Sequence, residues 1–268
     1  MIRAAVTGAA GRMGKTLIEA IYGSKELILT AAFEQPGLSV IGADAGDLCG
    51  LGPLGVAISE DIKSEADKFD VLIDFSTPKS SMIGLSVCES TASALVVGTT
   101  GFSEDDLVLL DRAATKIPVV MAPNMSVGVN VLFKLIEAAA ASLGDNFDVE
   151  VIEAHHRDKI DAPSGTAVRI GEILAGTMGR NLESDAVYGR QGAEGPRKTK
   201  TIGFETIRGG DIVGDHTVLF AGQGERLEIT HRAQSRMNFA QGALRAAIFA
   251  SNVSSGRYDM QDVLGLKD

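Results

Sequence analysis

The chain has 268 residues, of which 45% are hydrophobic, so it has enough apolar side chains for a dinucleotide-binding domain and a smaller second domain. Its formal net charge is −10, and the nearest approach to a basic run, Arg197-Lys198-Thr199-Lys200, is short and reads as a solvated loop. This acidic balance argues against nucleic acid as a partner.

The apolar runs are short compared with the ~18–20 residues needed to cross a bilayer. Residues 1–6 lead directly into a predicted strand and do not resemble a secretion signal. We therefore expect no membrane partner and a cytoplasmic location. Cys49 and Cys88 are the only cysteines, too few for a disulfide framework or a zinc site, and we interpret both as structural.

The first half of the chain alternates short apolar runs with helical patterns. In chain order, strands are predicted over 2–7, 27–33, 71–75, 94–97 and 118–121, and helices over 11–22, 80–90 and 104–116. Short apolar strands that alternate with helices indicate a parallel sheet covered on both faces. The fold class predicted for this half is α/β, a Rossmann-like doubly wound parallel sheet.

The second half has a different pattern. It predicts a helix over 127–142, a strand over 149–154, a helix from Ser164 to about Met178, a polar loop over 189–197, strands over 201–208, 212–221 and 226–232, and a helix over 239–250. The last three strands are separated by the turn sequences Gly209-Gly210-Asp211 and Gly222-Gln223-Gly224, and strands joined by tight turns are antiparallel neighbours. We therefore predict a second α+β domain with an open mixed, mostly antiparallel sheet.

A glycine-rich segment, Gly8-Ala9-Ala10-Gly11-Arg12-Met13-Gly14, lies between the first predicted strand and the first helix. Glycines there let the backbone approach a pyrophosphate, and the helix N-terminus offers free N–H groups. The spacing is one residue off the common G-x-G-x-x-G, so a glycine turn without a ligand is the alternative. Glu34 lies 20 residues after Gly14, where a carboxylate accepts hydrogen bonds from an adenosine ribose. A second small-residue turn, Gly98-Thr99-Thr100-Gly101, follows another strand.

Two of the four histidines are adjacent, at His155 and His156, where a predicted strand ends. Histidine titrates near neutrality and suits proton transfer, and Lys159 adds a cationic donor. Ser164 is a natural cap for the next helix, whose first N–H groups and the Thr166 hydroxyl can hold a carboxylate. This group of residues predicts a site for a small dianion beside a proton donor.

A metal is not expected at this site, because Arg157 and Lys159 would oppose a bound cation. The other two histidines, His216 and His231, lie in predicted strands and are interpreted as structural.

Over essentially its whole length the sequence resembles the 4-hydroxy-tetrahydrodipicolinate reductase (dihydrodipicolinate reductase) family. The stretch His-His-x-x-Lys-x-Asp-Ala-Pro-Ser-Gly-Thr-Ala, residues 155–167, is that family's signature. Further segments that carry the resemblance are 6–14, 74–76, 98–101, 122–130, 153–154, 202–204, 208–214 and 228–231.

The resemblance implies an NAD(P)H-dependent reductase of lysine biosynthesis by the diaminopimelate pathway, which passes hydride to a small dicarboxylate ring. It implies that His155 is a proton donor or acceptor and that Lys159 is a proton donor. His156, Gly165 and Thr166 would bind the substrate. The implied cofactor contacts are Gly8, Ala9, Ala10, Gly11, Arg12, Met13, Glu34, Gly98, Thr99, Thr100, Ala122, Pro123, Asn124 and Met125.

The family's architecture implies a dinucleotide-binding domain made of 1–126 and 237–268, and a substrate-binding and oligomerisation domain of 127–236 that builds a homotetramer. NADH and NADPH are the implied cofactors. Members that use both often have Arg after the acidic residue, whereas this chain has Gln35, so we expect NADH to be modestly preferred.

Two alternatives to this reductase stay open. One is another NAD(P)-dependent amino-acid dehydrogenase, such as diaminopimelate or aspartate dehydrogenase, whose site patterns are absent here. The other is a non-catalytic NAD(H)-binding sensor on the same scaffold. A sensor would be expected to lack His155 or Lys159, and the chain has both.

Overall fold

The structure is a computed structural model that describes residues 1–193 and 195–267. The chain forms two compact units. Unit 1 consists of Met1–Val127 and the residues from Arg236 on, and unit 2 is Gly128–Ser235. Each boundary lies one residue from the predicted one, and the helix near the C-terminus returns to the first unit.

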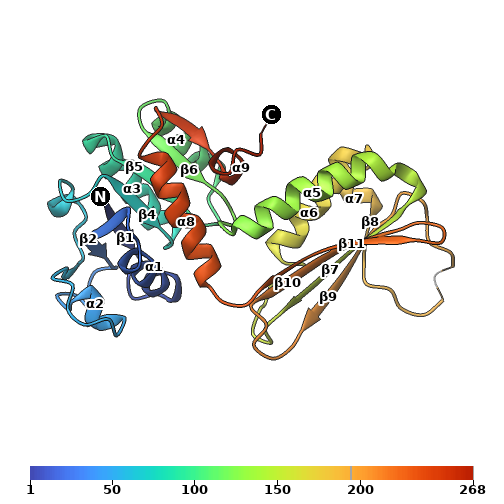
Figure 1. Cartoon of the computed structure of the whole chain (residues 1–268), viewed down its shortest axis with the longest axis horizontal. Helices are drawn as coiled ribbons and strands as arrows, with labels where there is room; N and C mark the ends of the chain where they lie inside the picture. Colours follow the sequence, from blue (N-terminus) through green and yellow to red (C-terminus); the bar gives the residue numbers. More distant parts are fainter. Residues whose placement is uncertain (194, 268) are drawn as a thin grey trace. The chain divides into compact units, whose positions relative to one another are not determined.

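Unit 1 contains a seven-stranded sheet in which every strand pair is parallel, in the order β12-β6-β5-β4-β1-β2-β3. Figure 1 labels β1, β2, β4, β5 and β6 of this sheet. The strands are β1 (Ile2–Thr7), β2 (Leu27–Phe33), β3 (Ile58–Ser59), β4 (Val71–Asp74), β5 (Ala94–Val97), β6 (Pro118–Met121) and β12 (Gly256–Tyr258). The helices are α1 (Arg12–Tyr22), α2 (Ala45–Leu48), α3 (Pro78–Thr91), α4 (Glu104–Ala114), α8 (Met237–Ala250) and α9 (Met260–Val263), with a 3₁₀ turn η1 (Lys63–Glu65). The predicted Rossmann-like fold is confirmed.

Apolar side chains cover both faces of this sheet, because successive residues of a strand point to opposite faces. Leu17 of α1 and Leu244 of α8 belong to one buried cluster, together with Val6 of β1. Leu85 of α3 and Leu110 of α4 belong to a second cluster. The sheet therefore has helices on both sides, and its strand-end loops are left to form sites.

Two helix starts in unit 1 follow from their caps. α3 begins at Pro78, two residues before the predicted start, because Thr77 caps the helix and proline is well suited to its first position. α4 begins after Ser103, which forms a capping box with Asp106. The short elements α2, β3, β12 and α9 were not predicted, since two to four residues are too few to show a period.

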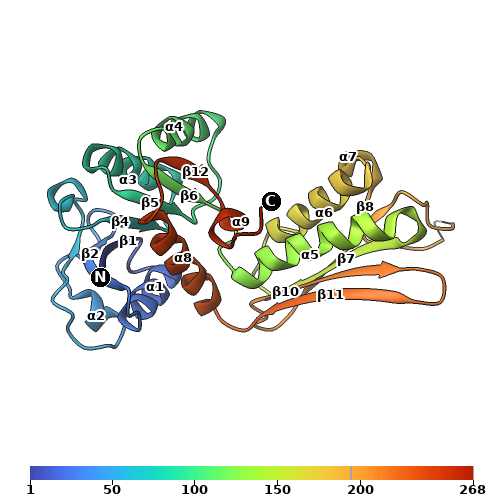
Figure 2. The same cartoon turned by 45° about the horizontal axis from the view of Figure 1, so that its top comes forward.

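Unit 2 is a five-stranded mixed sheet with helices on one face, as Figures 1 and 2 show from two directions. The strand order is β11-β10-β7-β9-β8, with β7 (Asp148–His155), β8 (Ala186–Tyr188), β9 (Ile202–Arg208), β10 (Gly214–Ala221) and β11 (Arg226–Ala233). The helices are α5 (Val127–Leu143), α6 (Gly165–Met178) and α7 (Leu182–Asp185), with a 3₁₀ turn η2 (Gly144–Asn146). Val129 and Ile136 of α5 and Leu174 of α6 are buried in one cluster with residues of the sheet.

The predicted pairing of the strands on either side of Gly209-Gly210-Asp211 was wrong. β9 and β10 are not neighbours, because β7 lies between them, antiparallel to β10 and parallel to β9. The connection is long enough to pass over one strand, since neighbouring strands are only about 4.8 Å apart. Gly209 N donates to the carbonyl of His155, which holds the connection over the end of β7. Two strand pairs are antiparallel and two parallel, so antiparallel pairs are not the majority.

One helical stretch is longer and more apolar than expected. Val127–Asn146 has the length and composition of a membrane-spanning helix, with 20 residues and a mean hydropathy of 1.4. Its buried side chains, Leu132 and Ile136 among them, pack into the core of unit 2. Only 33% of the apolar window is buried in this way, and Val131 and Leu135 on the same helix are exposed.

Candidate active site

The glycine loop between β1 and α1 requires its glycines. Gly8 has a φ of +68°, and a Cβ there would lie 2.8 Å from the carbonyl oxygen of Phe75. A Cβ on Gly14 would lie 2.0 Å from the carbonyl oxygen of Gly8. Gly11 is the N-cap of α1 and contributes no side-chain hydrogen bond. The first turn of α1 is therefore close to the loop backbone and carries no side-chain cap, as an anion site requires.

Glu34 follows β2, and the structure brings it to the glycine loop. Its Oε2 accepts a hydrogen bond from Ala10 N at 3.0 Å, and its Oε1 accepts one from Gln35 N at 2.9 Å. Each carboxylate oxygen has a second lone pair, so the group can still accept from a ribose hydroxyl. Sequence spacing alone indicated this acidic partner, and the fold places it within reach of the loop.

A cavity of about 470 Å³ opens beside the loop and Glu34. Gly8, Gln35 and Pro36 line it, together with the first turn of α3. That turn contributes Lys79, an exposed cation that the sequence analysis did not single out. Only the packing of α3 against the strand-end loops shows that Lys79 and Gln35 share a cavity. Arg12 is exposed and does not line this cavity.

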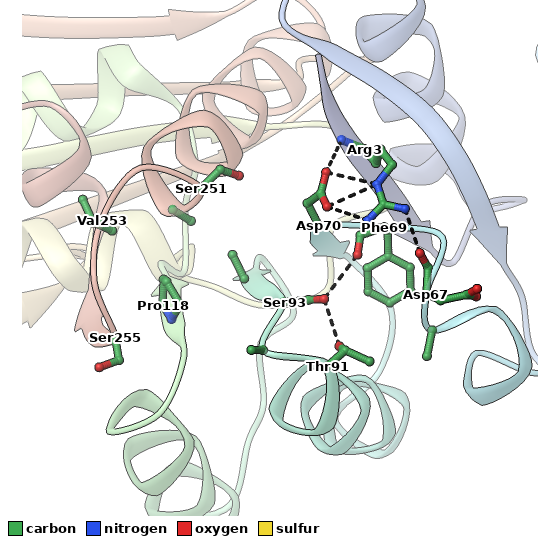
Figure 3. Close-up of a pocket in the computed structure, with 14 residues that line it drawn as sticks. Arg3, Asp67, Phe69, Asp70, Thr91, Ser93, Pro118, Ser251, Val253 and Ser255 are labelled. Carbon is green, nitrogen blue, oxygen red and sulfur yellow. Dashed lines mark hydrogen bonds and ion pairs between the residues drawn. The ribbon is translucent and has the colours of Figure 1, made fainter.

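A second cavity of about 410 Å³ lies in unit 1, and Figure 3 shows the residues that line it. Its most prominent charge, Arg3, is paired with Asp70, with 2.7 Å between Nη2 and Oδ1. These two residues lie at the amino ends of β1 and β4. Ligands of open α/β sheets bind at the carboxyl ends of the strands, which favours the cavity beside the glycine loop.

A buried carboxylate, Asp74 at the end of β4, ties the cavity's loops together. It accepts hydrogen bonds from the hydroxyls of Thr7, Ser76, Ser81 and Thr99. The Thr99 bond is 2.8 Å long, and Thr99 Oγ1 also accepts from Ser76 N at 2.8 Å. These bonds use the hydrogen and one of the two lone pairs of the Thr99 hydroxyl, so Thr99 can offer a cofactor its backbone groups and one remaining acceptor position. Asp74 thus connects β1, α3 and the 98–101 turn.

The remaining predicted cofactor residues, apart from the exposed Thr100, follow β6. Ala122 and Met125 are buried, and Ala122 N donates to the carbonyl of Val97. Asn124 turns its side chain back to accept from Ser126 N at 2.9 Å. The segment can therefore offer a cofactor mainly backbone groups and the exposed Pro123.

In unit 2, His155 is the last residue of β7, and Glu153 lies two residues before it on the same face of the strand. Both are buried, with 1% of Glu153 and 9% of His155 exposed. Glu153 Oε2 lies 2.6 Å from His155 Nδ1. Burial would raise the pKa of the Glu153 carboxyl, but hydrogen bonds from Arg208, His155 and Ser164 outweigh it and hold the pKa below its ordinary value. Glu153 is therefore an ionised partner of His155.

The His155 ring is itself difficult to protonate. Burial is the main cause that lowers its pKa, the charges of Lys159 and Arg208 act in the same direction, and Glu153 opposes them. The ring of His216 packs edge-on against the ring of His155, with 5.1 Å between the ring centroids. Burial lowers the pKa of His216 to about 3, and its Nε2 lies 2.8 Å from Ser164 Oγ. His216 is thus a neutral, buried residue beside the site.

The predicted dianion-binding residues lie near the end of β7 and the start of α6. Ser164 caps α6 as predicted, since its Oγ accepts from Ala167 N at 3.1 Å. Gly165 and Thr166 are the first two residues of that helix. His156 is half-buried. Lys159 Nζ donates to both oxygens of Asp161, at 2.8 and 2.7 Å. The cation predicted to bind a substrate carboxylate is therefore paired with a carboxylate of the protein itself.

Three residues around His155 were not predicted from the sequence to have a role. Glu153 contacts the His155 ring, Arg208 binds the Glu153 carboxylate, and Gly214 lies beside the ring. The alternation of β7 was a usable signal, because it places Glu153 on the same side as His155. Arg208 and Gly214 come from β9 and β10, and only the strand order brings them there.

Comparison with known proteins identifies the family. The model "Dihydrodipicolinate reductase, N-terminus" matches residues 2–125, and "Dihydrodipicolinate reductase, C-terminus" matches residues 128–264. The chain belongs to the dihydrodipicolinate reductase family. It is also 57% identical over 267 residues to the 4-hydroxy-tetrahydrodipicolinate reductase of Hahella chejuensis (strain KCTC 2396), with 100% of both chains covered. The predicted family is thereby confirmed.

Solved structures agree in fold. A dipicolinate-bound dihydrodipicolinate reductase from Paenisporosarcina sp. TG-14 has a TM-score of 0.77 at 24% identity, covering 98% of this chain and 99% of that one. A diaminopimelate dehydrogenase from C. glutamicum has a TM-score of 0.56 at 14% identity, covering 100% and 96%. At such identities the likeness concerns the fold, which these reductases share with amino-acid dehydrogenases.

Proposed function

We propose that the chain is a 4-hydroxy-tetrahydrodipicolinate reductase of the diaminopimelate pathway to lysine. It would convert (2S,4S)-4-hydroxy-2,3,4,5-tetrahydrodipicolinate to (S)-2,3,4,5-tetrahydrodipicolinate: water leaves the 4-position, and the ring gains one hydride and one proton. The observation that carries this proposal is the full-length, 57% identity to an enzyme of that name. His155 and Lys159, in the sequence pattern characteristic of the family, support it.

Unit 1 has the features of a nicotinamide-dinucleotide site. The close approach of Gly14 to Gly8 leaves no room for a Cβ, so the backbone is free to face a pyrophosphate. Glu34 and the adjacent cavity of about 470 Å³ suit the adenosine end. The reduced nicotinamide, when bound, supplies the hydride. The protein's part here is to orient the dinucleotide through the loop at 8–13, Glu34 and the segments 98–100 and 122–125.

Unit 2 would bind the dicarboxylate and move the proton. The amide groups of Gly165 and Thr166 at the start of the 14-residue helix α6 can receive one carboxylate, and His156 can donate to it. Lys159 can exchange Asp161 for the other carboxylate or donate a proton. His155, oriented by Glu153, would transfer the reaction's proton.

NADH and NADPH would both serve, with NADH modestly preferred. Glu34 would repel a 2′-phosphate, whereas Lys79 on the same cavity would attract it. We also propose that the protein acts in the cytoplasm as a homotetramer built by the sheet of unit 2.

The test is oxidation of NADH or NADPH coupled to the freshly made condensation product of pyruvate and aspartate semialdehyde, with His155→Gln as the inactive control. Turnover that depends on this product supports the proposal. Reduction of NADP⁺ by diaminopimelate, without turnover of the condensation product, would instead identify an amino-acid dehydrogenase. Tight NADH binding without either reaction would identify a sensor.

A further inference from the structure

We infer that Glu153 is a positioning residue that fixes the tautomer of His155, so that Nε2 of His155 is the atom that exchanges the proton. The inference rests on the proposed role of His155. It adds to that role a named nitrogen atom and the carboxylate that selects it.

Glu153 selects the tautomer of His155 because its carboxylate can accept hydrogen bonds but cannot donate one. The Glu153 carboxylate is bound by Arg208 through two bonds, Nη1 to Oε2 at 2.7 Å and Nη2 to Oε1 at 2.8 Å. Ser164 N donates to Oε1 at 3.0 Å. A carboxylate ionised in this way can only accept hydrogen bonds. The 2.6 Å contact with His155 Nδ1 therefore requires a hydrogen on Nδ1. In the neutral ring, Nε2 then carries the free lone pair.

The surroundings of Nε2 support this assignment. A Cβ built on Gly214 of β10 would lie 3.0 Å from Nε2 and 3.3 Å from Cδ2. The absence of a side chain at Gly214 leaves that edge of the ring uncovered on one side. Nδ1 faces the buried carboxylate. The two nitrogens therefore have different tasks, one anchored by Glu153 and one available for proton transfer.

The charges around His155 determine what loss of the carboxylate would do. Glu153 is its anionic contact on β7, Arg208 of β9 and Lys159 of the following loop are cations, and His216 of β10 is a neutral neighbour. If the carboxylate is neutralised, two cations remain beside the ring. The imidazolium then becomes less stable, so the pKa of His155 must fall.

A purely structural role for Glu153 is the alternative, because the same carboxylate joins Arg208 to the start of α6. Such a role predicts lower stability in a variant, but no change in which nitrogen carries the hydrogen. A measurement of the tautomer separates the two roles without reference to activity.

The decisive measurement is ¹⁵N NMR of the histidine side chains, with His155 assigned by comparison with His155→Gln. In the wild-type protein above the pKa of His155, we expect the hydrogen on Nδ1. An Nε2–H tautomer would overturn the inference. Since this readout needs no turnover, it is independent of the proposed function, which would fail if the wild-type protein did not oxidise NADH or NADPH with the condensation product.

The second measurement compares Glu153→Gln with Arg208→Gln. In the first variant kcat should fall at least about tenfold, and the kinetic pKa of His155 should move down by about 1 unit or more. In the second variant a cation is lost and the carboxylate stays, so this pKa should move up. If both variants lose stability while the pH profile stays in place, Glu153 is structural. Should Glu153→Gln fail to fold, Glu153→Asp, which keeps the charge but shortens its reach, should also lower kcat.

Discussion

At the scale of single residues, His155 is the group on which the proposed chemistry depends most. We expect His155→Gln to lower kcat by roughly 10²–10⁴, the range for an acid–base group, with a much smaller change in KM. Steady-state kinetics at saturating NADH provides the measurement. A variant within about threefold of the wild-type kcat would remove His155 from the mechanism.

Lys159 should matter for both binding and turnover. Lys159→Ala removes a charge-assisted contact, so it should lower kcat and weaken the binding of a planar pyridine-2,6-dicarboxylate inhibitor. Thr166→Val should mainly weaken the binding of this inhibitor. Asp161→Asn is the matched variant: it releases Lys159 from an internal ion pair of 2.7 Å and should preserve or tighten inhibitor binding. Unchanged inhibition constants in both Lys159→Ala and Thr166→Val would mean that the carboxylates bind elsewhere.

Cofactor preference should depend on the cavity beside Glu34. We expect NADH to be favoured by about 1 kcal/mol, or several-fold in kcat/KM, because contacts open to water lose much of their Coulomb energy. Gln35→Arg should narrow or invert this ratio through the KM for NADPH. Lys79→Gln should raise the KM for NADPH and leave that for NADH unchanged. Arg12→Gln is the comparison: Arg12 belongs to the glycine loop but does not line this cavity, so the variant should change the KM values for NADH and NADPH by similar factors. A wild-type preference for NADPH of tenfold would contradict the prediction.

At the scale of elements, Asp74 should stabilise the strand ends of unit 1. Asp74→Ala leaves four hydroxyl groups without their shared acceptor, and we expect a loss of about 2–4 kcal/mol in the free energy of unfolding. Affinity for NADH should also fall, because Thr7 and Thr99 hold the loops of the cavity. Thermal unfolding and cofactor titration measure the two effects. Asp70→Asn is the control: its ion pair with Arg3 is half open to water, so this variant should leave Tm nearly unchanged. An equal loss of stability in Asp74→Ala and Asp70→Asn would refute the role of Asp74.

Elements with a clear period were predictable, and pairing between distant strands was not. The predicted strands of unit 1 agree with β1, β2, β4, β5 and β6, because buried parallel strands are continuous apolar runs. The turn at Gly209-Gly210-Asp211 marked a reversal of the chain correctly. It did not reveal that β7 fills the space between β9 and β10, since hydrogen bonding between strands is set by the assembled sheet.

At the scale of the whole molecule, stability should fall in mild acid. His216 has a pKa of about 3 in the folded protein and about 6.5 when unfolded, so between these values the unfolded chain binds more protons. Stability is therefore lost as the pH falls from about 6.5, by up to ~1.4 kcal/mol per pH unit from this residue. Glu153, whose pKa is lowered, adds a further loss below about pH 4.5.

Thermal unfolding at a series of pH values between 7 and 4 measures this dependence. His216→Phe keeps the ring packing and removes the titration, so its stability should depend less on pH between 6.5 and 4.5. An identical pH dependence in the variant and the wild-type protein would contradict the assignment.

The sequence by itself determined the family, the parallel sheet of unit 1, the glycine loop with Glu34, and the residues of the 155–167 stretch. These features depend on local spacing: the period of buried strands, a turn that tolerates only glycine, and a cap such as Ser164. The tertiary structure decided which side chains from distant segments meet. It brought Lys79 into the cavity of Gln35 and set Arg208 and Gly214 around His155. Such contacts depend on strand order and on the burial of charge, and neither is encoded in the spacing of neighbouring residues.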